Sequence, residues 1–225
     1  GAAGTGKTTL VREFMRNLDE NMMNATVNMN YYTDACALQT QLEQSIDKRS
    51  GKTYGPPASK KLVYFIDDLN MPLIEEYGTQ TPIALLRQHV DYTSWFDRVD
   101  LGLKKTIQDV QLIAAMNHKS GSFFVNPRLQ RHFATWGCQM PSDADLSFVY
   151  SSILENHLSA FPNAVQKVCK PLVDSTLEVH KTMAERFLPS AIKFHYNFNM
   201  RDLAAVFQGL CQSNAEYYRT SLSIS

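Results

Sequence analysis

Apolar residues recur along the first part of the chain with spacings that alternate between those of helices and those of strands. Residues 10–18 carry apolar side chains at helical spacing, whereas residues 25–32 alternate in the manner of a strand. The continuous apolar run at 62–66 is typical of a parallel strand that is buried on both faces. This order of elements favours an α/β fold built on a parallel sheet.

The same kind of pattern continues to about residue 141. The further predicted elements are helices near 38–46, from Thr81 and around 127–132, and strands at 110–116 and 133–138. Two polar stretches, 47–61 and 95–106, lie between these elements. We expect both to be loop or hairpin insertions into the α/β fold.

After residue 141 the pattern becomes helical throughout, apart from a short piece near 192–198. Ser142 is placed to cap one helix, a long helix is predicted over about 163–187, and Asn199 is placed to cap a third. We therefore expect two lobes, an α/β lobe over 1–141 and an all-helical lobe over 142–225.

Composition narrows the class of protein. The chain has 225 residues, of which 44% are hydrophobic, and its 22 lysines and arginines balance 22 acidic residues. The absence of a basic excess argues against a nucleic-acid surface, and no apolar run of about 18 residues predicts a membrane span. The four cysteines show no paired spacing, which favours reduced thiols over a disulfide or zinc framework.

The first nine residues carry the strongest chemical signal. They fit G-x-x-x-x-G-K-S/T, a loop whose backbone N–H groups surround phosphates at the start of a helix. Such a match arises by chance in roughly one sequence of this length in a hundred, and the alternative is a glycine-rich turn before a helix. The residues expected to bind nucleotide are Gly1, Gly4, Thr5, Gly6, Lys7, Thr8 and Thr9.

A phosphate loop ordinarily follows a central strand, yet here the loop begins at residue 1. We therefore expect a sheet that lacks its first strand. Because neighbouring strands would then keep unpaired backbone groups, we expect the isolated chain to be unstable or to aggregate.

Asp67 and Asp68 follow the buried strand at 62–66. A carboxylate at the carboxyl end of a parallel strand can hold Mg²⁺ opposite Thr8, although such an aspartate can also be a turn or cap residue. Asp68 is placed to polarise the attacking water, and the alternative is that it only caps the next segment. It stands where related sites carry glutamate, and it is shorter by roughly 1.5 Å. A misplacement of about 1 Å costs on the order of a hundredfold in rate, so we expect slow hydrolysis.

Asn117 ends the strand at 110–116 and could bind the γ-phosphate or the attacking water, although asparagine after a strand is commonly a turn former. Arg128 and Arg131 share one face of a short helix. They are either a solvated or ion-paired face or an arginine finger for a neighbouring subunit, which can be worth about 10³–10⁵ in rate.

Arg201 lies in the first turn of the helix that Asn199 caps. A cation is disfavoured at this end of a helix, so its presence calls for an anionic partner. The two candidates are Asp202 and a nucleotide phosphate reaching across from the α/β lobe.

Taken in chain order, the loop, Asp67, Asn117, the arginine pair and Arg201 resemble the AAA+ ATPases over essentially the whole chain. The resemblance implies a P-loop lobe of three layers with a parallel sheet, followed by a small helical lid. It assigns the loop to Walker A, 62–68 to Walker B and Asn117 to sensor 1. Arg201 corresponds to sensor 2, and the arginine pair lies in the finger region.

Five longer segments of the sequence resemble the dynein heavy chains of the axonemal branch. Among the six AAA+ modules of those chains, the segments resemble the third module most. The segments are 64–72, 85–88, 95–97, 126–133 and 198–203. The two polar insertions match places where dynein modules carry hairpins that can face the linker element.

This resemblance implies an ATP- or ADP-binding module with Mg²⁺, in a microtubule motor of the axoneme, cilium or flagellum. Its implied partners are the neighbouring modules and the linker, with intermediate chains, light chains and microtubules contacted by other parts of the motor. No nucleic-acid or membrane partner is implied. The third module is regulatory in this family, and Asp68 departs from the usual glutamate.

Two rival functions remain open on the sequence. One is a structural module that holds ADP without hydrolysing it, and the other is a free AAA+ remodelling ATPase that assembles as a homohexamer.

Overall fold

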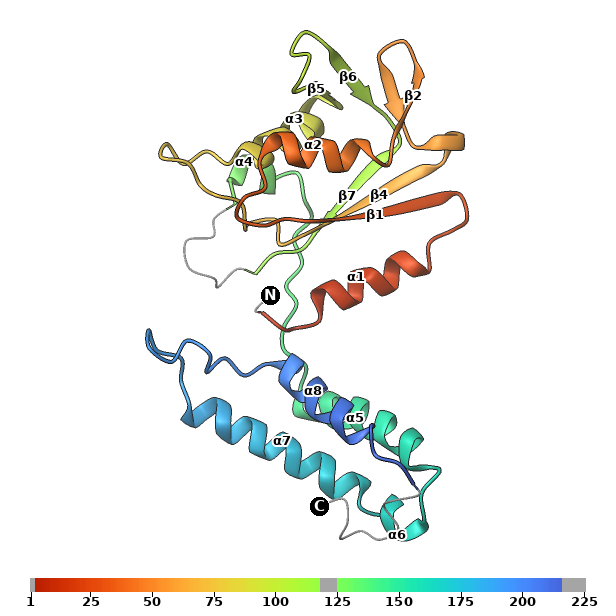
Figure 1. The fold of residues 1–225 in the computed structure, drawn as a ribbon, viewed down its shortest axis with the longest axis vertical. Helices are drawn as coiled ribbons and strands as arrows, with labels where there is room; N and C mark the ends of the chain where they lie inside the picture. The colour runs from red at the N-terminus through yellow and green to blue at the C-terminus, as the bar shows by residue number, and fades with distance from the viewer. Residues whose placement is uncertain (1–2, 118–124, 216–225) are drawn as a thin grey trace. The chain divides into compact units, whose positions relative to one another are not determined.

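The computed structural model describes residues 3–117 and 125–215 (Figure 1). These residues form two compact units, one from Gly6 to Cys138 and one from Gln139 onward, with residues 3–5 grouped with the second. In the first unit the elements are α1 (Lys7–Arg16), β1 (Met22–Asn28), α2 (Ala35–Glu43), β2 (Asp47–Ser50), β3 (Thr53–Gly55), a 3-10 turn (Pro57–Ser59), β4 (Lys61–Asp67), α3 (Thr81–Tyr92), β5 (Ser94–Phe96), β6 (Lys104–Ile107), β7 (Val110–Ala114) and α4 (Pro127–Gln130).

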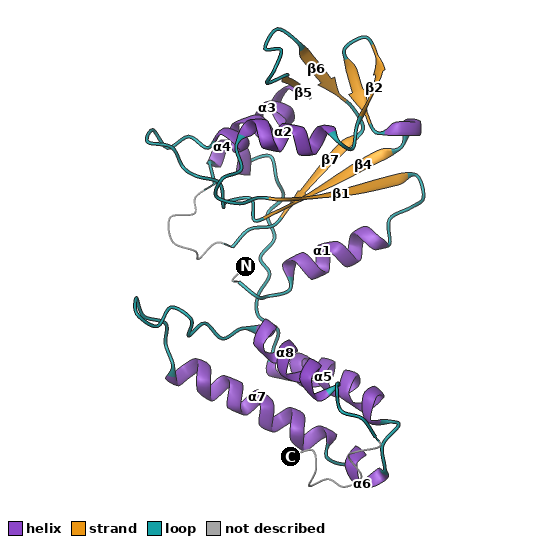
Figure 2. Ribbon diagram, viewed as in Figure 1, coloured by secondary structure: helices purple, strands orange, loops and turns teal. Residues whose placement is uncertain are grey.

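The centre of the first unit is a parallel sheet in the order β1-β4-β7 (Figure 2). Helix α1 covers one face, and α2, α3 and α4 lie on the other, so the unit has three layers. Strand β4 is central, and its residues from Leu62 to Ile66 are buried on both faces. The continuous apolar run therefore forms the predicted central strand, and the mixed α/β class is confirmed.

Alternate side chains of β4 enter two different cores. Leu62, Tyr64 and Ile66 pack in the larger core with residues of α2 and α3. Phe65 packs with Met15 of α1 on the opposite face. This alternation follows from the two-residue period of a strand and fixes both helical layers to the same strand.

Both predicted insertions are hairpin-forming segments. Together they build a second sheet in the order β2-β3-β6-β5, in which β3 and β6 are parallel and the outer pairs are antiparallel. Its chain continues directly into the first sheet, because only Gln108 and Asp109 separate β6 from β7. Asp109 has a φ of 58°, and its carboxylate forms an ion pair with Arg49 of β2.

A charged cluster around the buried Lys105 attaches this second sheet to α2. The Nζ atom of Lys105 lies 2.8 Å from Glu43 and 2.5 Å from Asp97, and Trp95 donates to Glu43 at 2.9 Å. Burial opposes the lysine charge, but the bonds to Asp97 and Glu43 together raise the pKa of Lys105. The same bond from Lys105, with backbone donors at Asp100 and Val99, lowers the pKa of Asp97 to about 2.

Two predicted elements differ in kind from the structure, and the strand predicted at 25–32 lies at Met22–Asn28 instead. The strand expected at 133–138 is wrong, because these residues form no ladder with any described strand. A strand needs a neighbour for its backbone groups, and Trp136 in this segment is exposed. The long helix expected at 163–187 is two helices, α6 (Asn163–Gln166) and α7 (Cys169–Arg186).

The second unit is helical in its described part. Besides α6 and α7 it contains α5 (Asp143–Leu158) and α8 (Met200–Leu210). Ser142 caps α5 and Asn199 caps α8, each in a reciprocal capping box, as their positions in the sequence predict. Tyr150 and Phe207 stack with ring centroids 4.2 Å apart in the core between these helices.

Candidate nucleotide-binding site

The glycine-rich loop has the backbone that its sequence requires. Gly4 and Gly6 have φ values of 73° and 80°, in the left-handed region that glycine adopts without strain. Helix α1 begins at Lys7 immediately afterwards, so its first N–H groups face the end where an anion would bind. Gly1 lies outside the described residues.

Thr8 and Asp67 meet although 59 positions separate them. The Thr8 hydroxyl donates a hydrogen bond of 2.8 Å to Oδ2 of Asp67, and both residues are partly buried. Helix α1 supplies the first residue, and the carboxyl end of β4 supplies the second. A hydroxyl and a carboxylate oxygen are ligands that Mg²⁺ accepts, with phosphate and water completing its shell. The donor set therefore fits the predicted metal.

The other loop residues follow along the chain. Thr5 precedes the helix, Lys7 is its first residue and is partly buried, and Thr9 is exposed on its first turn. Among the described residues, no group of three or more His, Cys, Asp or Glu side chains is arranged to hold a metal.

Asp68 is exposed directly beyond β4 and has a φ of 54°. Its backbone N–H donates to Oδ1 of Asp67 at 3.1 Å. Left-handed backbone is uncommon for residues other than glycine, but aspartate and asparagine tolerate it best. The Asp67-Asp68 turn thus orients one carboxylate toward Thr8 and leaves the other at the surface.

Asn70 is a site residue that the sequence reasoning did not single out. It is 2% exposed, and its side-chain amide donates to the backbone oxygen of Asn117 at 2.8 Å. This bond joins the loop after β4 to the segment after β7, and it fixes the backbone of Asn117. The signal was a polar residue within the otherwise apolar stretch that follows Asp68.

The predicted arginine pair lies at α4. Both side chains are exposed, and the α4 cap is Asn126, whose side chain accepts from the backbone of Arg128. Arg131 lies 3.6 Å from Asp91 of α3, whereas no ion pair of Arg128 is found within residues 3–117 and 125–215.

Arg201 lies in the second unit, at the second residue of α8. Of its two predicted partners, Asp202 is engaged elsewhere, because its carboxylate accepts from the backbone of Asn199 at 2.8 Å. In the part of the chain that the structure describes, the Arg201 side chain forms no ion pair.

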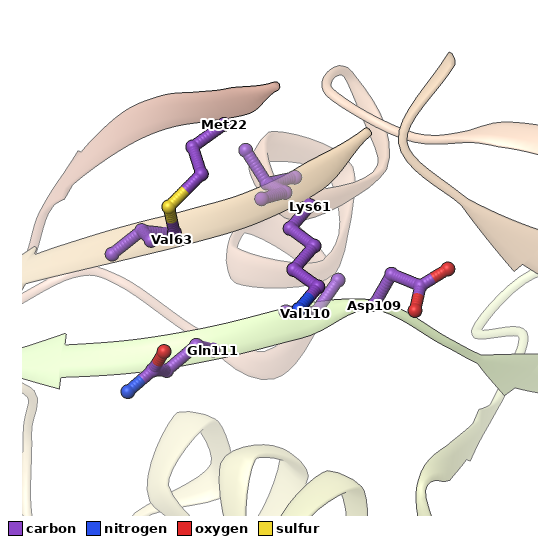
Figure 3. A pocket seen from close by; sticks show the side chains of 7 residues that line it. Met22, Lys61, Val63, Asp109, Val110 and Gln111 are labelled. Atoms are coloured by element: carbon purple, nitrogen blue, oxygen red, sulfur yellow. The ribbon is translucent and has the colours of Figure 1, made fainter. Parts of the chain in front are cut away.

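A hollow of about 210 Å³ lies at the other end of the parallel sheet (Figure 3). The first residues of β1, β4 and β7 line it, Met22, Lys61 and Val110, together with Asp109 just before β7. Strand β4 extends about 20 Å from Lys61 to Asp67 at roughly 3.3 Å per residue. The hollow is therefore remote from the Thr8–Asp67 pair and is not part of the same site.

The glycine loop before α1 and the Thr8–Asp67 bond at the end of a central parallel strand define a nucleotide-binding protein of the P-loop class. The family described as "P-loop containing dynein motor region" matches residues 1–141, and "AAA+ lid domain" matches residues 172–225. The chain therefore belongs to the dynein motor-region family of P-loop proteins.

The proteins of known identity that are similar to this chain include several dynein heavy chains. "Dynein beta chain, ciliary" of Heliocidaris crassispina is 48% identical over all of this chain, and "Dynein beta chain, flagellar outer arm" of Chlamydomonas reinhardtii is 47% identical over all of it. "Dynein axonemal heavy chain 9" of Homo sapiens is 47% identical over 98% of it. The chain spans 5% of the length of each. In the described residues no helix is long and apolar enough to cross a membrane.

Proposed function

We propose that this chain is a Mg²⁺- and ATP- or ADP-binding AAA+ module of an axonemal dynein heavy chain. The observation that carries the proposal is the 2.8 Å bond between Thr8 and Asp67, because it brings the two predicted metal ligands together beside the phosphate loop. Residues 1–141 form the α/β nucleotide-binding lobe in this proposal, and residues 142–225 form the helical lid.

The complete protein is, on this proposal, a microtubule motor of the axoneme that drives ciliary or flagellar movement. Support comes from the names of the relatives and from the small share of each that this chain spans. The same facts favour a module within a long heavy chain over a free remodelling ATPase. Its immediate partners would be the adjacent AAA+ modules and the linker element, and other parts of the motor would contact microtubules and accessory chains.

Each site residue has a chemical role in the proposal. Lys7 and the loop N–H groups bind the phosphates, and Thr8 with Asp67 would hold Mg²⁺, which when bound offsets phosphate charge. Asp68 and Asn117 orient the attacking water, and Asn70 holds the Asn117 backbone in place. Arg201 would respond to the γ-phosphate from the lid.

The module is best suited to a regulatory role, as expected of the third module of the ring. Asp68 supports this role, because its side chain is one carbon shorter than the glutamate of faster sites and its backbone is held in the left-handed region. The same observation supports a second candidate function, a module that holds nucleotide without hydrolysing it.

The decisive test replaces Lys7 in the intact heavy chain. Lys7→Ala should abolish nucleotide binding at this site, because the phosphates lose their main cationic ligand. Binding is measured by counting labelled nucleotides per heavy chain, with Arg12→Ala as control, since Arg12 is an exposed cation on the same helix. Full retention of the labelled nucleotide by the Lys7 variant would sink the proposal.

A further inference from the structure

The two arginines at α4 differ in whether a carboxylate of this chain already lies beside them. Nη2 of Arg131 lies 3.6 Å from Oδ1 of Asp91, and Nε of Arg131 lies 3.3 Å from Nε2 of His132. Arg128 is exposed, and none of the described residues forms an ion pair with it. A carboxylate beside a guanidinium cancels much of the field that the cation exerts on a distant phosphate.

Asp91 receives basic groups from two helices. It lies in the last turn of α3, and only about a fifth of its side chain is exposed. Its Oδ1 is 2.8 Å from Nε2 of His132 and 3.6 Å from Arg131, while its Oδ2 is 3.6 Å from Nε of Arg87. One carboxylate thus links the end of α3 to the end of α4.

Helix α4 is a single turn that needs such anchors. Asn126 caps its start, and Leu129 is completely buried in the main core. His132 follows the turn and contacts Asp91. Because Leu129 faces the core, its neighbour Arg128 projects to the surface. When Nε2 of His132 carries the proton, it donates to Asp91. In the other tautomer, Nε2 accepts from Arg131, so each tautomer keeps one of the two contacts.

We propose that Asp91 is a positioning residue that offsets part of the charge of Arg131 and anchors α4 through His132, so that Arg128 presents the larger uncompensated charge to the nucleotide of the neighbouring module. The inference rests on the proposed function, because it requires a neighbouring module of a ring. It adds Asp91 of α3 to the residues that act on the neighbouring module. It also assigns different roles to Arg128 and Arg131, which the sequence alone does not distinguish.

The test uses the full heavy chain in which only the preceding module keeps its P-loop lysine, so that a fluorescent ATP analogue reports on that module alone. Arg128→Ala should raise the dissociation rate of the analogue about tenfold or more, because a charge-assisted contact to phosphate is lost. Arg128→Lys should restore part of the affinity, and Arg131→Ala should change the rate less than about twofold.

The role of Asp91 is tested in the Arg128→Ala background. Adding Asp91→Asn, which keeps size and removes charge, should slow dissociation again, because the charge of Arg131 is then no longer partly offset. Adding Arg131→Ala to that double variant should remove the gain. A purely structural role for Asp91 predicts no such recovery, so a double variant no slower than Arg128→Ala would overturn the positioning role.

The remaining outcomes separate the two levels of the proposal. If Arg131→Ala matches or exceeds the effect of Arg128→Ala, the assignment of Arg128 is overturned. If neither variant changes the rate, the action on a neighbouring module is overturned. Nucleotide binding by this module is judged independently by Lys7→Ala in the otherwise native heavy chain.

Discussion

At the scale of single residues, Asp68 combines an uncommon backbone with an uncommonly short side chain. Its φ of 54° places the carboxylate beyond β4 in a conformation that few side chains tolerate. Strained backbone of this kind costs on the order of 1–3 kcal/mol and tends to occur at functional sites. The position therefore restricts which substitutions give an interpretable result.

Asparagine is the matched substitution at this position, because it has the same shape and also tolerates left-handed backbone. If the site hydrolyses ATP slowly, Asp68→Asn should reduce single-turnover hydrolysis at this module by roughly 10²–10⁴-fold while nucleotide stays bound. Equal rates in the native protein and in Asp68→Asn would instead support the non-hydrolysing module.

His89 predicts a pH dependence of stability. It is buried against Trp95, with ring centroids 5.3 Å apart, and burial lowers the pKa of His89 to about 4. In the unfolded chain the ordinary value of 6.5 applies, so the unfolded state binds the proton first. The stabilisation is complete above pH 6.5 and is lost as pH falls toward 4, by up to roughly 3 kcal/mol.

The measurement is hydrogen exchange of α3 amides in the intact motor at pH 7 and pH 5, corrected for intrinsic exchange. Opening of α3 should become easier at pH 5. His89→Phe should remove most of this difference, since Nδ1 of His89 has no hydrogen-bond partner in the described structure to lose. An unchanged pH dependence in His89→Phe would refute the assignment.

The residue types in the sequence were enough to predict that Thr8 and Asp67 lie together in the candidate site. Thr8 and Asp67 carry motif chemistry that specifies which atoms must meet, and the structure brings them within 2.8 Å. The partner of Asn70 could not be predicted in this way, because it is the backbone oxygen of a residue 47 positions away. A contact to backbone leaves no complementary residue type to find in the sequence.

At the scale of elements, the cluster around Lys105 joins α2 to the second sheet. Lys105 is 7% exposed and lies between Glu43 and Asp97. Removing the lysine would leave two carboxylates facing each other without a cation. Breaking a fully buried pair costs about 3–5 kcal/mol, and a smaller value applies here because both carboxylates keep some contact with water.

We expect Lys105→Met to destabilise the second sheet by about 2 kcal/mol. The readout is hydrogen exchange of β3, β5 and β6 amides in the intact motor, which should exchange faster than in the native protein. Lys104→Met is the matched control, because Lys104 precedes it on β6 and is exposed. Comparable effects of the two variants would show that the cluster does not hold the sheet.

Elements were predicted well where the local pattern also determines the partner. The run at 62–66 can be satisfied only in the middle of a sheet, and it forms the central strand. The segment 133–138 is also largely apolar, but a strand requires a neighbour as well, and no described strand pairs with it. Pairing of β3 with β6 was likewise not predictable, because nothing in either hairpin specifies the other.

At the scale of the whole molecule, β7 is an edge strand. It pairs with β4 on one side, and no described strand pairs with its other side. Leu10 and Phe14 of α1 are also more than half exposed. Unpaired strand edges beside exposed apolar side chains promote association between chains.

The 225-residue chain in isolation should therefore aggregate or unfold without a cooperative transition. Calorimetry combined with light scattering at several protein concentrations tests this, and aggregation should increase with concentration. The control is the intact heavy chain measured in the same buffer. A sharp, reversible and concentration-independent transition of the isolated chain would contradict the expectation.

The short junction at Gln108 and Asp109 has a mechanical consequence. Strand β6 leads into β7 through these two residues, and β7 ends three residues before Asn117 (Figure 1). The two strands are already extended at about 3.3 Å per residue, so only the two-residue junction, where Asp109 departs from extended backbone, can lengthen. A pull along β6 therefore stretches almost no loop before it loads β7, and the ion pair of Asp109 with Arg49 distributes that load to β2. The second sheet and the segment carrying Asn117 are therefore mechanically coupled through β6, the junction and β7.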